Sequence, residues 1–286
     1  MLLCRFNRVG DDAVRVGLVE GGARVIDLTA AGVDSLQSVL ESNDPTAFVQ
    51  EMRGRSSTEV PLNSIQLRAP IERQEIWAAG VTYLRSKTAR MEESDFSATA
   101  YDKVYDAERP EIFFKSVAEK VVATGEPVGI REDAKWSVPE PELALVLNSR
   151  GLVVGHTIGN DMSSRDIEGE NLLYLPQAKV YKDSCALGPW IRLGTPEALV
   201  REWLIRITIY RNGAPIFLGE TSVGNIKRAF AELAGFLFRS QRFPHGAVLL
   251  TGTGIVPPDS FTLQEYDDIE IEIPEIGVLR NSVIVV

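Results

Sequence analysis

The feature that most constrains the fold is a succession of short β-rich segments, separated by turn residues, with few helical patterns between them. Alternating or unbroken apolar runs predict strands over 142–147, 152–158, 204–210, 214–218, 268–273 and 282–286. Many short strands favour a β-sandwich or roll over βαβ units. No Rossmann or Walker glycine pattern stands at a strand-to-helix junction. We therefore predict an α+β fold built on a mixed β-sandwich roll.

The first 68 residues carry a pattern of their own. Two strand-like runs over 14–19 and 23–28 flank a Glu-Gly-Gly turn, and Ser35 can cap a short amphipathic helix. The polar stretch over 53–61 ends in proline and indicates a linker. The pattern predicts a small N-terminal α/β domain over 1–68 and a catalytic β-roll domain over 69–286. One longer helix is predicted after Asn225, which can cap it.

Composition excludes several kinds of function. The chain has 30 Lys+Arg against 40 Asp+Glu, a formal net charge of −10, which argues against nucleic-acid binding and docking on anionic membranes. No apolar run is long enough to span a bilayer, and the apolar N-terminal stretch is too short for a signal peptide, so we expect it to form the first strand. Two cysteines are too few for a disulfide framework, which fits a reducing cytoplasm, and we expect a cytoplasmic protein. Two histidines are too few for a histidine-rich metal centre. Any metal should be hard and held by oxygen.

The most informative stretch is Val138-Pro-Glu140-Pro-Glu142. Residues two apart in a strand point to the same face, so both glutamates share one side. If the turn over 148–151 closes a hairpin with Leu147 opposite Leu152, Glu142 falls opposite Thr157 and Glu140 opposite Gly159. Asp161 is then the next position on that face.

Three carboxylates this close repel one another, and a divalent cation removes that repulsion. Oxygen ligands and open water positions suit Mg²⁺, with Mn²⁺ close in preference. The alternative is an ordinary acidic edge strand facing solvent, since edges commonly carry charge.

The acidic hairpin belongs to a longer set of motifs. Glu140-Pro-Glu142-Leu-Ala-Leu-Val-Leu is followed by Gly155-His-Thr-Ile-Gly-Asn160-Asp161. Supporting matches are Pro110-Glu-Ile-Phe-Phe-Lys115, Lys179 with Cys185-Ala-Leu-Gly188-Pro189-Trp190, and Leu249-Leu-Thr-Gly-Thr253-Gly. Together they resemble the fumarylacetoacetate hydrolase superfamily over the last three quarters of the chain. The resemblance implies a β-sandwich roll, a metal at Glu140, Glu142 and Asp161, and a homodimer or homotetramer.

One departure bears on the reaction. Superfamily members that cleave C–C bonds carry a His-Glu dyad that activates water, and here Ser86 and Ala89 stand at those two positions. This form resembles the 2-keto-3-deoxy-pentonate dehydratases of the same superfamily. It implies Mg²⁺-dependent dehydration of a 2-keto-3-deoxy sugar acid, such as the arabinonate or xylonate, to 2-oxoglutarate semialdehyde. The alternatives are a metal-dependent C–C hydrolase or decarboxylase of an acylpyruvate or diketo acid, and a non-catalytic keto-acid binder.

Candidate roles follow from the motifs. Glu111 is the first candidate for proton transfer, against the alternative of a surface glutamate, and Lys179 is the second. Arg165 is expected to pair with Asp166 and brace the metal loop, and His156 to pack on the opposite face. The residues expected to contact the 2-keto acid are Thr82, Ser86, Arg90, Lys179 and Thr253.

Overall fold

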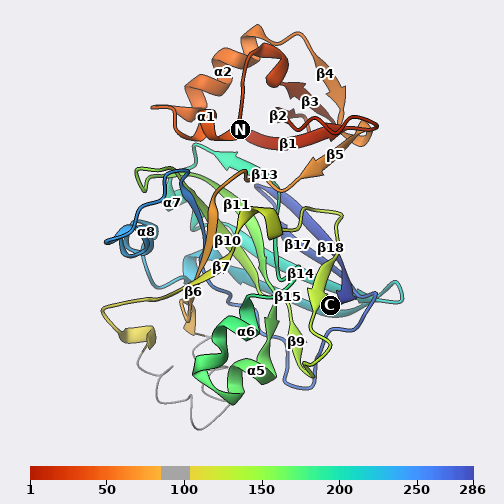
Figure 1. Ribbon diagram of the computed structural model, residues 1–286, viewed down its shortest axis with the longest axis vertical. Coiled ribbons are helices and arrows are strands. Elements are labelled where there is room, and N and C mark those ends of the chain that lie inside the picture. The colour runs from red at the N-terminus through yellow and green to blue at the C-terminus, as the bar shows by residue number, and fades with distance from the viewer. Residues whose placement is uncertain (85–103) are drawn as a thin grey trace.

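The computed structural model describes residues 1–84 and 104–286, and within them two β-sheets pack together, the larger of which extends into a smaller N-terminal unit at the top of Figure 1. The larger sheet has the order β4 (Glu59–Pro61), β3 (Arg24–Asp27), β2 (Arg15–Glu20), β1 (Leu2–Arg8), β13 (Cys185–Leu193), β11 (Val153–Asp161), β10 (Pro141–Leu147), β16 (Ala247–Leu250), β6 (Glu75–Gly80) and β7 (Glu111–Ser116), with β5 (Ile65–Arg68) also pairing β1. All its described pairs are antiparallel except β16 with β6.

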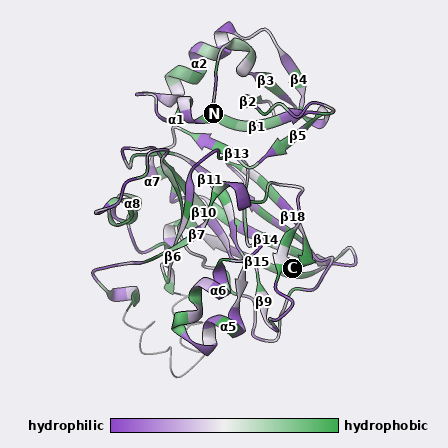
Figure 2. Cartoon of the chain, viewed as in Figure 1, coloured by the Kyte–Doolittle hydropathy of each residue, from purple (hydrophilic) through white to green (hydrophobic). Residues whose placement is uncertain are grey.

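A second sheet packs against the first. Its order is β15 (Ala214–Ser222), β14 (Leu204–Arg211), β17 (Asp268–Ile273), β18 (Gly277–Val285) and β8 (Val128–Ile130), and a short ribbon joins β12 (Ser163–Ser164) to β9 (Ser137–Val138). Leu143, Leu145 and Ile158 of the larger sheet share one buried cluster with residues of the second sheet, among them Ile207, Ile269 and Leu279. The hydrophobic residues gather along these strands (Figure 2). The predicted α+β fold with a mixed sandwich roll is confirmed.

The opposite face of β10 packs into a second cluster. Ala144 and Val146 lie in it with Leu36 and Val39 of the N-terminal unit. Because side chains alternate along β10, odd positions face the sandwich interior and even positions face this second cluster. Glu140 and Glu142 share the even face.

The N-terminal unit contains two helices, α1 (Leu36–Leu40) and α2 (Pro45–Arg55). Ser35 caps α1 as predicted, its side chain accepting from the Ser38 N–H. The predicted linker over 53–61 is wrong, because its first residues end α2 and its last form β4. The sequence of α2 has few apolar residues at helical spacing, and only two of its residues are buried, so periodicity did not indicate this helix.

The strands of the first 68 residues share a sheet with the rest of the chain, because β1 pairs with β13. The division between residues 68 and 69 therefore stays a prediction.

Later in the described part of the chain lie the α-helices α5 (Arg165–Glu170), α6 (Leu175–Lys179), α7 (Glu197–Val200) and α8 (Phe230–Phe238). Helix α8 begins five residues later than the predicted cap at Asn225. The Glu197 carboxylate accepts from the Phe230 N–H at 3.1 Å, so a residue distant in sequence satisfies this end of the helix. Local sequence could not indicate that cap.

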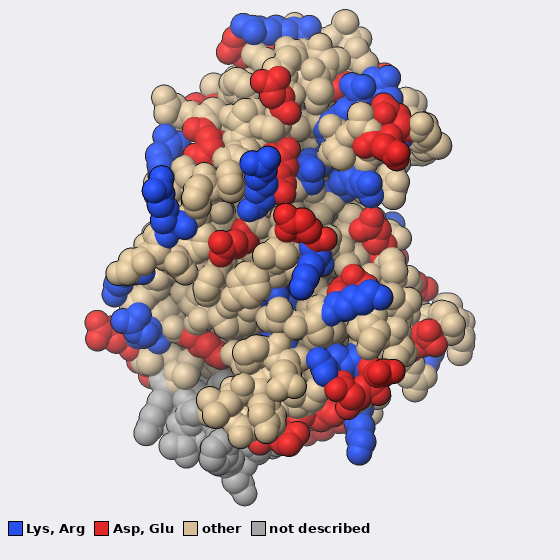
Figure 3. Space-filling view, viewed as in Figure 1, with Lys and Arg blue, Asp and Glu red and all other residues tan. Residues whose placement is uncertain are grey.

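Acidic and basic side chains are interspersed over the face drawn in Figure 3. Across residues 1–84 and 104–286, no helix is long and apolar enough to cross a membrane.

Candidate metal centre

The hairpin of β10 and β11 brings the acidic residues together, but in a different register from the one predicted. Glu142 pairs with Gly159, not Thr157, and Asp161 lies beside Glu140, whose carbonyl oxygen accepts from its N–H at 3.0 Å. Two single-residue shifts cause this. Asn148 pairs with Leu152 instead of lying in the turn, and a bulge follows Val146. Together they shift the register by two residues, an even number, so the acidic residues stay on the face that was predicted.

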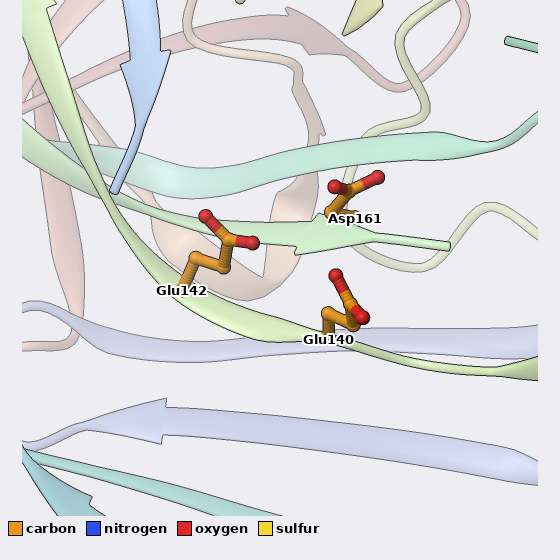
Figure 4. Close-up of side chains that lie close together, drawn as sticks. All are labelled: Glu140, Glu142 and Asp161. Carbon is orange, nitrogen blue, oxygen red and sulfur yellow. The ribbon is translucent and has the colours of Figure 1, made fainter. Parts of the chain in front are cut away.

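The three carboxylates point into one space between the two strands (Figure 4). Glu140, Glu142 and Asp161 are all buried, and each offers an oxygen within 4.8 Å of the others. A solvated acidic edge strand does not fit this burial, because carboxylates that face solvent remain exposed.

Burial and like charge act most strongly on Glu142. Desolvation, followed by the charges of Asp161 and Glu140, raises the pKa of Glu142 well above its usual range, against the opposing effects of Lys179 and the Gly252 N–H. That N–H donates to Glu142 Oε2 at 2.5 Å. A nearby cation would therefore favour the ionised form of Glu142.

Lys179 places a positive charge beside two of the three acidic residues. Its Nζ, at the end of α6, donates to Glu140 Oε2 at 2.7 Å and to Asp161 Oδ2 at 3.0 Å. It also donates to Ser163 Oγ at 2.6 Å. The ammonium is buried, and these contacts fix its position between two of the acids.

Two further cations, Arg165 and Lys115, contact the acidic residues. The sequence predicted a different partner for Arg165 and no role for Lys115. Arg165 donates to Glu140 Oε1 at 2.6 Å, so its expected pairing with Asp166 is wrong. Asp166 instead accepts from the Lys135 N–H at 2.7 Å. At the first position of α5, Arg165 is buried and its side chain reaches inward, which the adjacent acid in sequence did not indicate.

Lys115 is the second of these cations. Its buried Nζ forms an ion pair with Asp161 and donates to the carbonyl oxygens of Met162 at 2.9 Å and Lys179 at 2.5 Å. Alternation along β7 could have identified it, since Glu111, Phe113 and Lys115 are spaced two apart.

The acidic residues line a narrow pocket with a cavity volume of about 20 Å³. Glu111 lines it from the start of β7, opposite Gly80, where a Cβ would lie 2.1 Å from Glu111 Oε2. Only glycine leaves room there for the Glu111 carboxylate. The other lining residues include Phe113, Arg165, Glu168, Lys179 and Thr253. Glu168, buried on α5, was missed because nothing in its local sequence distinguishes it.

The other predicted substrate contacts are distributed differently. Thr253 lines the pocket, and its hydroxyl bonds with the backbone of Ile255. Thr82 is buried outside the pocket lining and donates to the Thr251 carbonyl oxygen at 2.5 Å, beside Gly252. Ser86 and Arg90 lie outside the described residues. His156 packs against the rings of Trp203 and Phe230, as expected.

The donor set fits a hard divalent cation. Oxygens bound to Mg²⁺ at about 2.0–2.1 Å lie about 3–4 Å from one another, which is compatible with carboxylates within 4.8 Å. A carboxylate offers about four lone-pair sites, so Glu140 and Asp161 can bind a metal while accepting from the lysines and Arg165. Glu140, Glu142 and Asp161 would hold it.

Known proteins match over most of the chain. A family model described as "Fumarylacetoacetate (FAA) hydrolase C-terminal" covers residues 75–284. A Haloferax volcanii protein named "Probable 2-keto-3-deoxyxylonate dehydratase" is 44% identical over 263 residues, 91% of this chain and 86% of that protein. The 2-dehydro-3-deoxy-D-arabinonate dehydratase of Saccharolobus solfataricus is 41% identical over 227 residues, 78% of this chain and 76% of its own length.

A solved structure gives the same likeness in three dimensions. It is described as "2-keto-3-deoxy-D-arabinonate dehydratase complexed with magnesium and 2,5-dioxopentanoate". Its sequence is 32% identical to this chain, the TM-score is 0.78, and the match covers 100% of this chain and 99% of the other.

Proposed function

This chain belongs to the fumarylacetoacetate hydrolase family, and on that premise we propose that it is a Mg²⁺-dependent dehydratase of 2-keto-3-deoxy sugar acids. The substrates are pentonates such as 2-keto-3-deoxyarabinonate or 2-keto-3-deoxyxylonate, and the product is 2,5-dioxopentanoate, also called 2-oxoglutarate semialdehyde. The observation that carries the proposal is the buried set of Glu140, Glu142 and Asp161, in a chain 41–44% identical to two proteins named as such dehydratases.

The reaction removes one water molecule from the substrate. A C3–H bond and the C4–O bond break, a C3–C4 double bond forms, and the C4 hydroxyl leaves as water with one proton. The remaining enone then loses one proton from C5 and one from the C5 hydroxyl and gains one proton each at C3 and C4, which gives the saturated 2-keto aldehyde. A metal at the three carboxylates would supply Lewis-acid stabilisation of the charge that develops on the 2-keto oxygen.

We assign the proton at C3 to Glu111. Its carboxylate lines the pocket that the three acids share, and it stands on a strand, which holds it in place. Lys179 is less suited to carry that proton, because its ammonium already donates to two carboxylates and a hydroxyl. Its role is to position Glu140 and Asp161 and to add positive charge beside the substrate's oxygens.

Substrate contacts complete the assignment. We assign the substrate's carboxylate end to Thr253, which is supported by its position in the pocket lining on the loop that follows β16. Ser86 and Arg90 are proposed partners on the strength of their sequence positions, and Arg90 could bind a carboxylate through two parallel hydrogen bonds. Thr82 would act through the loop that carries Thr253, because its hydroxyl holds the Thr251 carbonyl oxygen.

We also propose that the protein works in the cytoplasm as a homodimer or homotetramer, without nucleic-acid or membrane partners. The formal net charge of −10 opposes binding to both kinds of anionic surface. Cys4 and Cys185 are buried free thiols, which accords with a reducing compartment. Gel filtration with light scattering would measure the oligomeric state.

The test of the proposed function is direct. The purified protein is incubated with Mg²⁺ and 2-keto-3-deoxyarabinonate or 2-keto-3-deoxyxylonate, and the product is followed by NMR. We expect the aldehyde signal of 2,5-dioxopentanoate, which a chelator abolishes and added Mg²⁺ restores. Pyruvate released from an acylpyruvate, without aldehyde from either pentonate, would contradict the proposal and indicate C–C hydrolysis.

A further inference from the structure

A second pocket lies on the other face of β11 from the metal centre. His156 and Asp161 are five positions apart on this strand, so they point to opposite faces. The pocket has a cavity volume of about 430 Å³, and it is lined by the β10–β11 turn, β11, the segment before α7, and α8. These elements lie together on the left of the body in Figure 1. Its size falls in the range of small-molecule sites.

His156 is the only imidazole in its lining and is 2% exposed. Neither ring nitrogen has a hydrogen-bond partner anywhere in the part of the chain that the structure describes. Burial lowers the pKa of His156 to about 4, so at neutral pH the ring has one N–H donor and one bare acceptor nitrogen. Buried polar groups without partners are uncommon because they lose their hydration without compensation.

Gly235 is the second unusual residue in the lining. It stands inside α8, where glycine is less favourable than alanine. A Cβ at Gly235 would meet no atom within 4 Å, so packing does not require a glycine. The missing side chain leaves space at the pocket. Because packing does not explain a glycine in the interior of this helix, its presence points to a functional reason.

The walls are mainly apolar, with Leu152, Val153, Phe230 and Phe238 among them. The charged residues in the lining already have partners. Glu197 accepts from Arg201 at 2.9 Å and from the Phe230 N–H. Arg150 donates to Asn43 Oδ1 and to the Ser42 carbonyl oxygen, both at 3.2 Å. Glu197 is thus ion-paired, and Arg150 is exposed so that water solvates its charge. The buried walls are mainly apolar, so the pocket suits a neutral ligand.

We propose that this pocket is a second ligand site, for a neutral molecule with a ring-sized apolar body and a hydroxyl that donates to a His156 ring nitrogen. Both nitrogens are buried in the structure, so binding of the ligand hydroxyl requires the ring to turn about its Cβ–Cγ bond. That torsion has broad energy wells in histidine. The site does not depend on the proposed dehydration, because it shares no residue with the acidic pocket.

The test uses phenol as the probe and imidazole ¹H–¹⁵N NMR as the readout on the full chain. The sequence has only two histidines, and His245 bonds with Gln37 outside this pocket, so it serves as an internal control. We expect saturable shifts of the His156 nitrogens while those of His245 stay in place. Toluene, which lacks the hydroxyl, should bind about fivefold more weakly, the loss expected for one hydrogen bond.

A matched pair of variants locates the site. Gly235→Leu fills the pocket from α8 and should weaken phenol binding by about tenfold or more. Gly54→Leu is the control, because Gly54 is also a helical glycine with no atom within 4 Å of its Cβ, and it lies in α2. Unmoved His156 signals at millimolar phenol would overturn the proposal. Equal affinity for toluene, or undiminished binding in Gly235→Leu, would overturn it as well.

Discussion

Replacing Lys115 with methionine tests the electrostatic design of the metal centre. Methionine retains most of the side-chain volume, so the substitution removes charge and donors without leaving a large cavity. Asp161 loses one of its two ammonium partners, and the carbonyl oxygens of Met162 and Lys179 lose a donor. The Lys179 carbonyl still accepts from Ser184 Oγ at 2.9 Å, which reduces the damage there.

The magnitude follows from the burial of these groups. Breaking a fully buried ion pair by removing one partner costs about 3–5 kcal/mol, and orphaning a buried carbonyl adds to it. Since Asp161 retains Lys179, we expect Lys115→Met to lower the free energy of unfolding by about 4 kcal/mol. With an unfolding entropy of about 2 cal/mol/K per residue, the melting temperature should fall by about 7 °C. Urea unfolding and calorimetry in the presence of a chelator would measure both quantities.

Lys120→Met is the matched control. Lys120 is exposed in the segment after β7, and its substitution should change stability by less than about 0.5 kcal/mol. If Lys115→Met destabilises the protein no more than this control, Lys115 does not compensate the buried charge of Asp161 and the electrostatic account is wrong.

Three further outcomes are expected. Glu111→Gln should lower kcat about 10²–10⁴-fold while Mg²⁺ binding stays intact, with exposed Glu119→Gln as the control; unchanged kcat would remove Glu111 from the proton transfer. The folded pKa of His156, about 4, lies below the unfolded value of 6.5, so its contribution to stability is complete above pH 6.5 and is lost as pH falls towards 4. The wild type should therefore lose about 2 kcal/mol more than His156→Leu between pH 7 and pH 5 in urea titrations, and parallel pH profiles would refute this. Gly159→Ala places a Cβ 2.2 Å from Leu250 Cδ2 and should cost about 1–3 kcal/mol, whereas Gly235→Ala should gain about 0.5–1 kcal/mol; a denaturation midpoint that moves the same way in both variants would count against the packing described.

Local patterns predicted the parts of the fold that local sequence controls. The strands of the sandwich alternate clearly, and Ser35 caps α1 through its own neighbours. Helix α2 has a local start signal, because Asp44 accepts from the Ala47 N–H and Pro45 opens the helix, but it escaped prediction because it buries only Val49 and Met52. The start of α8 escaped prediction because a tertiary contact satisfies it. Arg53 of α2 binds Glu20 at 2.8 Å, and Glu197 caps α8 across 33 residues of sequence.

The convergence of Glu140, Glu142 and Asp161 was predictable because their placement depends only on strand alternation and one turn. The register error did not move them to the other face, since its two shifts summed to an even number. The surrounding cations were harder to predict. Lys115 pairs with Asp161 across 46 residues, and Arg165 pairs with Glu140 across 25 residues. No spacing in the sequence predicts which acid each cation contacts.

The central claim is that Glu140, Glu142 and Asp161 bind one divalent cation. Calorimetric titration of Mg²⁺ into the wild type, Glu142→Gln and Glu170→Gln at pH 7 tests it most directly, since Glu170 is an exposed acid on α5. We predict one site in the wild type and in Glu170→Gln, with affinity at least about 100-fold lower in Glu142→Gln. Wild-type affinity in Glu142→Gln would contradict the claim, as would the absence of Mg²⁺ binding to the unmodified protein.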